Sequence, residues 1–151
     1  MALVTDSSLG FLVAMVGRQA AAAFAATLAS HDTHPRDYAV LRALGDRPGC
    51  SQREVADALG LPPSRIVGLL DGLQEAGAIE REPDPTDRRA HRVRLTDSGR
   101  GRLNSLQERA DRLEAAIVAD LAPAERDELQ RLLGRVSAAL AREGSDATRL
   151  W

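Results

Sequence analysis

The segment 51–77 predicts two short helices joined by a tight turn, and this pair constrains the fold more than any other feature. Ser51 and Glu54 have the spacing of a capping box, in which each side chain accepts a hydrogen bond from the other residue's amide. Gly60 suits the left-handed conformation that ends a helix, and Pro63 suits the first turn of the next helix. Apolar residues recur at helical spacing through the second helix. The arrangement is typical of a helix-turn-helix.

Further helices flank this pair, and a short hairpin follows it. The expected elements are helices over 7–30, from Pro35, over 51–59, from Pro63 to the Gly77 stop, from Thr96 to about Ile117 and from Pro123, with strands over 79–82 and 91–95. The helices are predicted from apolar residues spaced three and four positions apart, and the strands are predicted from alternating apolar and polar residues. The expected fold class is mainly α with a small β-hairpin: a winged helix-turn-helix plus a helical dimerisation region.

The long fifth helix carries an apolar seam with coiled-coil-like spacing. Its members are Leu103, Leu106, Ala110, Leu113 and Ile117. The last helix has a similar apolar face. The seam could pack within one subunit. A chain of 151 residues offers little other core to cover two long helices, so we expect these faces to pack between the subunits of a homodimer.

Charge is unevenly distributed, although the formal net charge is only -2. All 20 basic residues are arginine, whose planar fork suits phosphate and guanine. The segment 81–102 holds seven arginines and four acidic residues, whereas 103–128 holds three arginines and seven acidic residues. The first segment therefore favours an anionic partner.

The second helix of the pair is expected to enter a DNA major groove, and the hairpin is expected to reach a neighbouring minor groove. Arg65 is the residue of the exposed first turn that can form a bidentate contact to guanine, and Arg88 and Arg89 lie at the hairpin tip. The candidate DNA-binding residues are Ser51, Gln52, Ser64, Arg65, Val67, Arg88, Arg89 and Arg92. The alternative is a hairpin whose arginines are simply exposed to solvent and contact no DNA.

The stretch from Arg36 to Gly99 resembles the MarR family of bacterial regulators. The matching segments are the helix-turn-helix 51–61, the helix 64–73, Gly77 and the hairpin motif Asp84-Pro85-Thr86-Asp87-Arg88-Arg89, which leads to Leu95-Thr96 and Gly99. The hairpin motif is the most specific of these. The flanking helices agree in number, length and order, so the resemblance covers nearly the whole chain.

The resemblance implies an obligate homodimer that binds double-stranded DNA at a pseudo-palindromic operator, usually as a repressor. A small, commonly phenolic or aromatic, ligand often releases such regulators. Arg89 corresponds to the family's wing arginine and Asp87 to the acid that braces the wing. The single MarR-like domain 1–151 then divides into dimerisation helices at 1–34 and 103–151 and a DNA-binding lobe at 35–102. Gly68 and Gly72 depart from the pattern, because relatives usually carry arginine or another polar residue there.

Three smaller features leave alternatives open. His31, His34 and Tyr38 could line a ligand pocket between the dimer helices and the lobe, or form a loop pair and a core tyrosine. Cys50 could be a redox switch, although a small buried residue is the more common role. The histidines and Cys50 lack a zinc-binding spacing, so we expect no metal and no cofactor.

The apolar run Phe11 to Val16 is short and lacks a basic lead, so the sequence predicts no signal peptide. The Ala-rich stretch that follows is interpreted as part of an amphipathic helix, so no membrane span is expected and the chain is expected to be cytoplasmic. An enzyme is disfavoured because the sequence shows no nucleophile–base pair, metal cluster or phosphate loop. A winged-helix module that binds protein without DNA is the alternative function.

Overall fold

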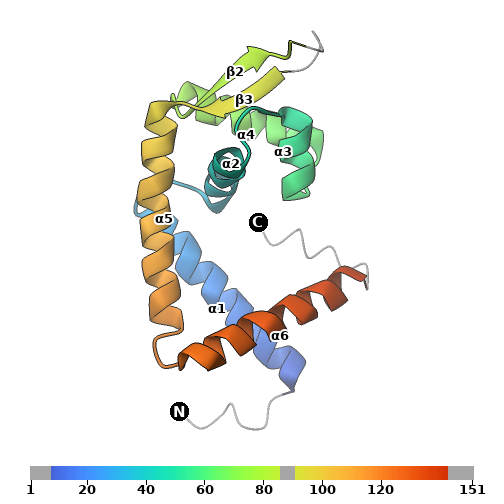
Figure 1. Cartoon of the computed structure of the whole chain (residues 1–151), viewed down its shortest axis with the longest axis vertical. Coiled ribbons are helices and arrows are strands. Elements are labelled where there is room, and N and C mark those ends of the chain that lie inside the picture. The colour runs from blue at the N-terminus through green and yellow to red at the C-terminus, as the bar shows by residue number, and fades with distance from the viewer. Residues whose placement is uncertain (1–7, 86–90, 143–151) are drawn as a thin grey trace.

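The computed structural model describes residues 8–85 and 91–142, which form six helices and three short strands. In chain order they are α1 (Leu9–Ala29), α2 (Pro35–Asp46), β1 (Cys50–Ser51), α3 (Gln52–Leu59), α4 (Pro63–Glu75), β2 (Ile79–Pro83), β3 (His91–Leu95), α5 (Asp97–Ile117) and α6 (Pro123–Arg142). Figure 1 shows α5 along the long axis, with α2, α3, α4 and the hairpin at one end and α1 and α6 toward the other. The mainly helical fold with a small antiparallel hairpin is confirmed.

The elements α2, α3, α4 and the three strands form what we call the winged lobe. Its core is built from fully buried aliphatic side chains of each layer, including Leu41, Val55, Ile66, Leu70 and Val93. Leu28 of α1 and Leu106 of α5 extend the same core, and Leu103 and Ala110 pack against it. For these three α5 residues the expected packing between subunits was wrong, because the winged lobe of the same chain covers them. The winged lobe therefore completes a hydrophobic core within one chain.

The sheet is antiparallel with the strand order β1-β3-β2. Strand β1 was not predicted from sequence. It has only two residues, so it shows no alternation, and its pairing of Cys50 with Val93 depends on a strand 43 positions away. This pairing holds the start of α3 against the hairpin.

The predicted helix ends are confirmed where local chemistry sets them. The Ser51 amide donates to Glu54 Oε2 at 2.7 Å, and the Glu54 amide donates to Ser51 Oγ at 3.2 Å. Gly60 ends α3 with a left-handed φ of 61°. Thr96 Oγ1 accepts from the Gly99 amide at 3.0 Å and so caps α5.

A close backbone contact joins α5 to the hairpin. The Thr96 amide donates to the Ala78 carbonyl oxygen at 3.1 Å, and the Thr96 hydroxyl donates to the Gly77 carbonyl oxygen at 2.6 Å. A Cβ at Gly99 would overlap the Ala78 carbonyl oxygen. Only glycine permits this approach, which fixes the direction in which α5 leaves the winged lobe.

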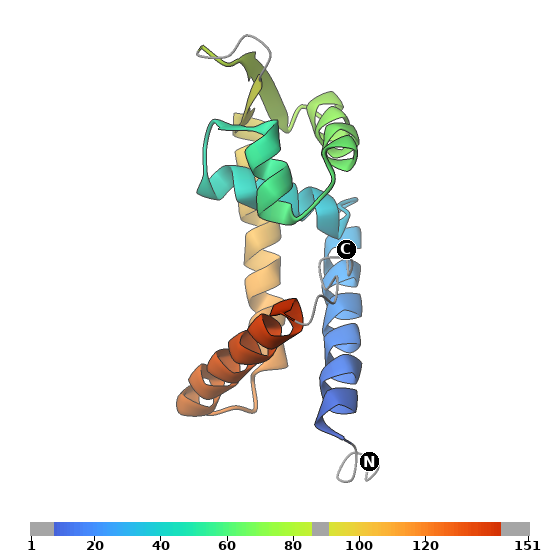
Figure 2. The same cartoon turned by 90° about the vertical axis from the view of Figure 1, so that its right-hand side faces the viewer.

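The helices α1 and α6 are poorly covered by the described part of the chain. The structure places no buried residue in α6, and Leu132, Leu133 and Leu140 are each more than 40% exposed. Leu9 and Phe11 of α1 are 74% and 58% exposed. Figure 2 shows α6 crossing below the winged lobe and α1 extending away from it.

One expectation about α1 was wrong. By length and composition, Leu9–Ala29 is long and apolar enough to cross a membrane, although no segment was expected to approach a span. Arg18 is its only charged residue, and its many alanines place apolar side chains on every face of the helix. Core helices of soluble proteins pass the same test, so the result identifies an apolar surface that needs cover and does not establish a membrane protein.

Candidate nucleic-acid interface

The helix α4 presents a polar and small-residue face outward while its apolar face enters the core. Ile66, Leu70 and Leu73 are buried. The opposite stripe consists of Ser64, Gly68, Asp71 and Glu75, all exposed. Arg65 and Val67 flank this stripe and are also exposed. The predicted exposure of Ser64, Arg65 and Val67 is therefore present, and a Cβ at Gly68 or Gly72 would meet only open space.

Ser51 and Gln52 lie at the start of α3, where the capping box organises the backbone. The Ser51 hydroxyl donates to Glu54 Oε2 at 2.8 Å and accepts from the Glu54 amide. The hydrogen bonds from Ser51 hold the pKa of the Glu54 carboxyl below its usual value. Ser51 is thus committed to the cap, and a DNA contact through its hydroxyl would compete with that role. Gln52 is half-buried.

The hairpin is braced by an acid that the sequence analysis did not single out. Arg92 donates from Nε to Asp84 Oδ2 at 2.9 Å, and the Asp84 side chain is only 12% exposed. Arg94 pairs more loosely with Glu82 at 3.7 Å. Arg92, a predicted DNA contact, is therefore engaged near the loop end of the hairpin, where it is paired with Glu82 in the sheet register. Arg88, Arg89 and Asp87 lie outside the described residues.

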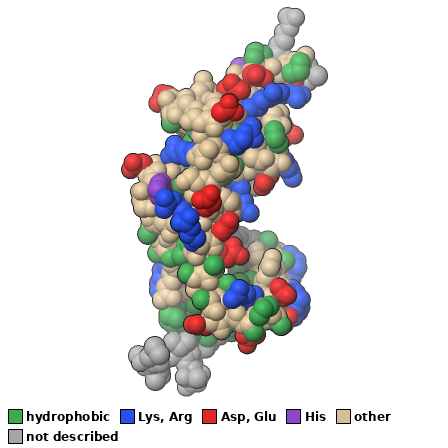
Figure 3. Space-filling view, turned by 60° about the vertical axis from the view of Figure 1, so that its left-hand side comes forward, with side chains coloured by type: hydrophobic (Ala, Val, Ile, Leu, Met, Phe, Trp, Pro, Cys, Tyr) green, Lys and Arg blue, Asp and Glu red, His purple; other side chains and the backbone are tan. Residues whose placement is uncertain are grey.

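A second contact links the hairpin to α4. Arg81 of β2 donates to Asp71 Oδ1 at 2.6 Å. The local sequence patterns did not indicate this pair, because its two members lie in different elements. Figure 3 shows basic and acidic side chains interspersed over one face of the molecule, so local pairing decides which arginines are available to a partner.

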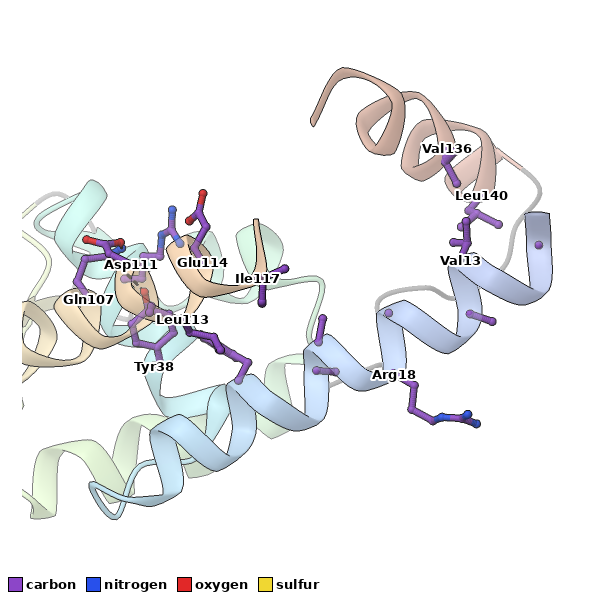
Figure 4. Close-up of a pocket in the computed structure, with 18 of the residues that line it drawn as sticks. Val13, Arg18, Tyr38, Gln107, Asp111, Leu113, Glu114, Ile117, Val136 and Leu140 are labelled. Atoms are coloured by element: carbon purple, nitrogen blue, oxygen red, sulfur yellow. Dashed lines mark hydrogen bonds between the residues drawn. The ribbon is translucent and has the colours of Figure 1, made fainter. Parts of the chain in front are cut away.

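A cavity of about 1100 Å³ lies between α1, α2, α5 and α6. Figure 4 shows Tyr38, Gln107 and Asp111 toward one end, and Val13, Val136 and Leu140 at the other. The Tyr38 hydroxyl donates to Gln107 Oε1 at 2.8 Å. Burial raises the pKa of the Tyr38 phenol, although the nearby Arg42 opposes the change.

The expected cluster of His31, His34 and Tyr38 does not form in this cavity. Tyr38 lines it, but His31 and His34 do not. His34 Nδ1 accepts a hydrogen bond from the Arg36 amide at 3.2 Å, so this side chain caps α2. Sequence proximity suggested the cluster, whereas the helix start turns Tyr38 inward and leaves His34 at the exposed end.

The surroundings of Cys50 disfavour a redox role on balance, although Arg47 and a backbone hydrogen bond act to lower the pKa of its thiol. The thiol is half-buried in β1. Burial raises its pKa, and the Glu54 carboxylate acts in the same direction. A raised pKa reduces the thiolate that oxidants attack. Among the described residues, no group of three or more His, Cys, Asp and Glu side chains is arranged to hold a metal ion.

A family model described as MarR family matches residues 31–90. The chain is 34% identical over 98 residues to the HTH-type transcriptional regulator PecS of Dickeya dadantii, a match that covers 65% of this chain and 59% of PecS. It is 33% identical over 96 residues to the HTH-type transcriptional regulator TtmR of Methylorubrum extorquens, covering 64% of this chain and 49% of TtmR. The chain therefore spans less than two thirds of these curated relatives.

Solved structures match over more of the chain. The PcaV transcriptional regulator of Streptomyces coelicolor, in complex with its natural ligand, aligns with a TM-score of 0.76 and 33% identity, over 92% of this chain and 99% of PcaV. The transcriptional repressor CouR, bound to a 23-mer DNA duplex, aligns with a TM-score of 0.78 and 30% identity, over 86% of this chain and 92% of CouR.

Proposed function

The chain belongs to the MarR family of winged helix-turn-helix transcriptional regulators, and we propose that it binds a pseudo-palindromic DNA operator as a homodimer and represses transcription. The observation that carries the proposal is the exposed face of α4 beside the braced hairpin. Such a pair suits two neighbouring grooves. CouR, which shares the fold, was solved on duplex DNA. Membership in a family of transcriptional regulators agrees with the expectation that the chain is not an enzyme.

Homodimerisation is supported by apolar faces that residues 8–85 and 91–142 leave uncovered. Leu133 and Leu140 of α6 are 49% and 44% exposed, and Leu9 and Phe11 of α1 are more exposed still. A second copy offers the same faces, so a two-fold arrangement buries both sets at once. The same burial accounts for the span-like composition of α1 without a membrane, and we place the protein in the cytoplasm.

We assign the cavity to a small aromatic ligand such as a phenol. Its apolar lining suits a ring, and Tyr38, Arg42 and Gln107 supply polar groups at one end. PcaV was solved with its natural ligand. A ligand lowers DNA affinity only if it prefers a dimer whose two α4 helices are wrongly spaced.

The DNA-binding proposal is tested by selection of bound duplexes from a randomised library. The expected result is an enriched, nearly palindromic site whose half-sites lie roughly one helical turn apart, since a two-fold dimer presents both helices to one DNA face. Arg65→Ala should relax the preference at one position of each half-site, because a bidentate contact to guanine is worth about 1–3 kcal/mol.

Failure to enrich any sequence, with binding that does not respond to salt, would reject DNA recognition and favour the protein-interaction module. The ligand assignment is tested separately, by screening phenols and aromatic acids against the selected duplex in a gel-shift assay. Loss of the response in Tyr38→Phe would support the cavity, and an unchanged response in Tyr38→Phe and Arg42→Ala would place the ligand elsewhere.

A further inference from the structure

One arginine of the hairpin is directed toward α4 and away from the solvent. Arg81 donates from Nη2 to Asp71 Oδ1 at 2.6 Å and to the Val67 carbonyl oxygen at 3.5 Å. Its side chain is only 18% exposed, whereas the Asp71 side chain is 52% exposed. The contact therefore runs from a wing strand to the middle of the helix proposed to read DNA.

The sheet register explains why this arginine is directed inward. Arg81 of β2 lies opposite Val93 of β3. Directly paired residues point to the same face of a sheet, and Val93 is fully buried. The aliphatic stem of Arg81 thus begins on the core face, and its guanidinium emerges at the edge of α4. This geometry turns the guanidinium toward Asp71 and away from any phosphate beyond the hairpin.

Asp71 is unfavourably placed for a helix that approaches DNA. It shares the outward stripe of α4 with Ser64, Gly68 and Glu75. The helix contains one cation, Arg65, and two acidic residues. Phosphate groups repel a carboxylate on such a face, since opposed like charges disfavour association. Arg81 supplies from β2 the positive charge that α4 lacks.

We propose that Arg81 is a positioning residue for DNA binding that acts through Asp71. By pairing with this carboxylate it neutralises the reading face of α4 and anchors the wing to that helix. The inference rests on the proposed DNA-binding function. It differs from the role of the Arg92–Asp84 pair, which lies within the hairpin and leaves α4 untouched.

A double-mutant cycle tests the proposal. The variants are Arg81→Ala, Asp71→Ala and the double variant, measured on a duplex selected by the unmodified protein and on a scrambled duplex of equal length. Arg81→Ala should lose affinity by roughly 10- to 100-fold, because the uncompensated Asp71 carboxylate then faces the DNA phosphates. Asp71→Ala should lose less, since no carboxylate remains. The double variant should match Asp71→Ala and so bind more tightly than Arg81→Ala.

Controls separate positioning from direct contact and from misfolding. Arg112→Ala breaks an exposed ion pair in α5 and should bind like the unmodified protein. Loss of a direct phosphate contact would weaken binding by the same factor whether or not Asp71 is present, whereas a positioning role predicts no further loss from Arg81→Ala once Asp71 is removed. If Arg81→Ala does not fold, Arg81→Gln and Asp71→Asn give the same cycle with side chains of similar size.

Two results would overturn the proposal while leaving DNA binding intact. One is an Arg81→Ala variant that binds as tightly as Arg112→Ala. The other is a double variant that binds no more tightly than Arg81→Ala. If the unmodified protein selects no duplex, the proposed function and this inference are both rejected, an outcome that differs from the two results above, in which DNA binding persists.

Discussion

The winged lobe and the terminal helices contain similar aliphatic residues but complete their packing differently. In the winged lobe, Leu41, Ile66 and Leu70 are fully buried within one chain. In α6, Leu132 and Leu133 are 42% and 49% exposed, although their spacing is equally regular. The difference shows that amphipathic spacing predicts which face is apolar and leaves open what covers it. We therefore expect the stability of the winged lobe to be intrinsic and that of α1 and α6 to depend on a second subunit.

The largest effect should come from a charge placed in the cavity between α1, α2, α5 and α6, whose apolar lining includes residues of the faces proposed to meet a second subunit. Leu113 of α5 is half-buried there. Leu113→Asp should dissociate the homodimer, because an uncompensated buried charge costs about 3–5 kcal/mol. Sedimentation at micromolar concentration measures the change. Ala115→Asp is the matched control, because Ala115 lies on the same helix, is exposed and does not line the cavity. A stable, folded monomer of the unmodified chain would contradict the expectation that α1 and α6 depend on a second subunit.

The core of the winged lobe should respond to substitution whether or not the dimer forms. Leu70→Ala should lower the free energy of unfolding by about 2–5 kcal/mol, through lost burial and a residual cavity. Urea denaturation should show the same loss over a range of protein concentrations. Leu133→Ala in α6 is the contrasting variant, whose effect should grow with the dimer population. Equal, concentration-independent losses in both variants would remove the distinction between the two regions.

The joint between the two regions should be sensitive to a single methyl group. Gly99→Ala places a Cβ against the Ala78 carbonyl oxygen, so α5 or the hairpin must shift. Overpacking of this kind typically costs about 1–3 kcal/mol. Gly101→Ala, two positions along, meets only open space and should stabilise α5 by up to about 1 kcal/mol. Thermal unfolding of both variants gives the comparison, and equal melting temperatures would show that the close contact is not required.

The smallest effect concerns the acid dependence of the winged lobe. The Glu54 carboxyl has a lowered pKa in the folded protein, so its contribution is present above its ordinary value of 4.5 and is lost as the pH falls through the folded pKa. Glu54→Gln should therefore make the fall in unfolding free energy below that value shallower. Denaturation curves at several pH values measure this slope. Parallel pH profiles for the two proteins would show that the capping carboxylate of Glu54 does not contribute to the pH dependence of the unfolding free energy.

Much of this fold is determined by neighbouring residues in the sequence. The Ser51–Glu54 box, the Gly60 stop and the Thr96 cap depend on contacts within four positions, and the structure confirms each. The exposed positions Ser64, Arg65 and Val67 follow from the helical period of α4. Local hydrogen bonds and periodicity act on the chain before any tertiary contact forms, which is why these features could be predicted.

Other features depended on which elements meet in space. Strand β1, the Asp84 brace and the Arg81–Asp71 contact each join residues that are at least eight positions apart. The same holds for the cavity, which includes Tyr38 and leaves out His34 because the capping geometry of α2 directs the two side chains differently. The sequence by itself determined the helices, their ends and their apolar faces, since these depend on local energies. The tertiary structure decided which charges are paired and which faces stay uncovered, because those depend on how the elements pack.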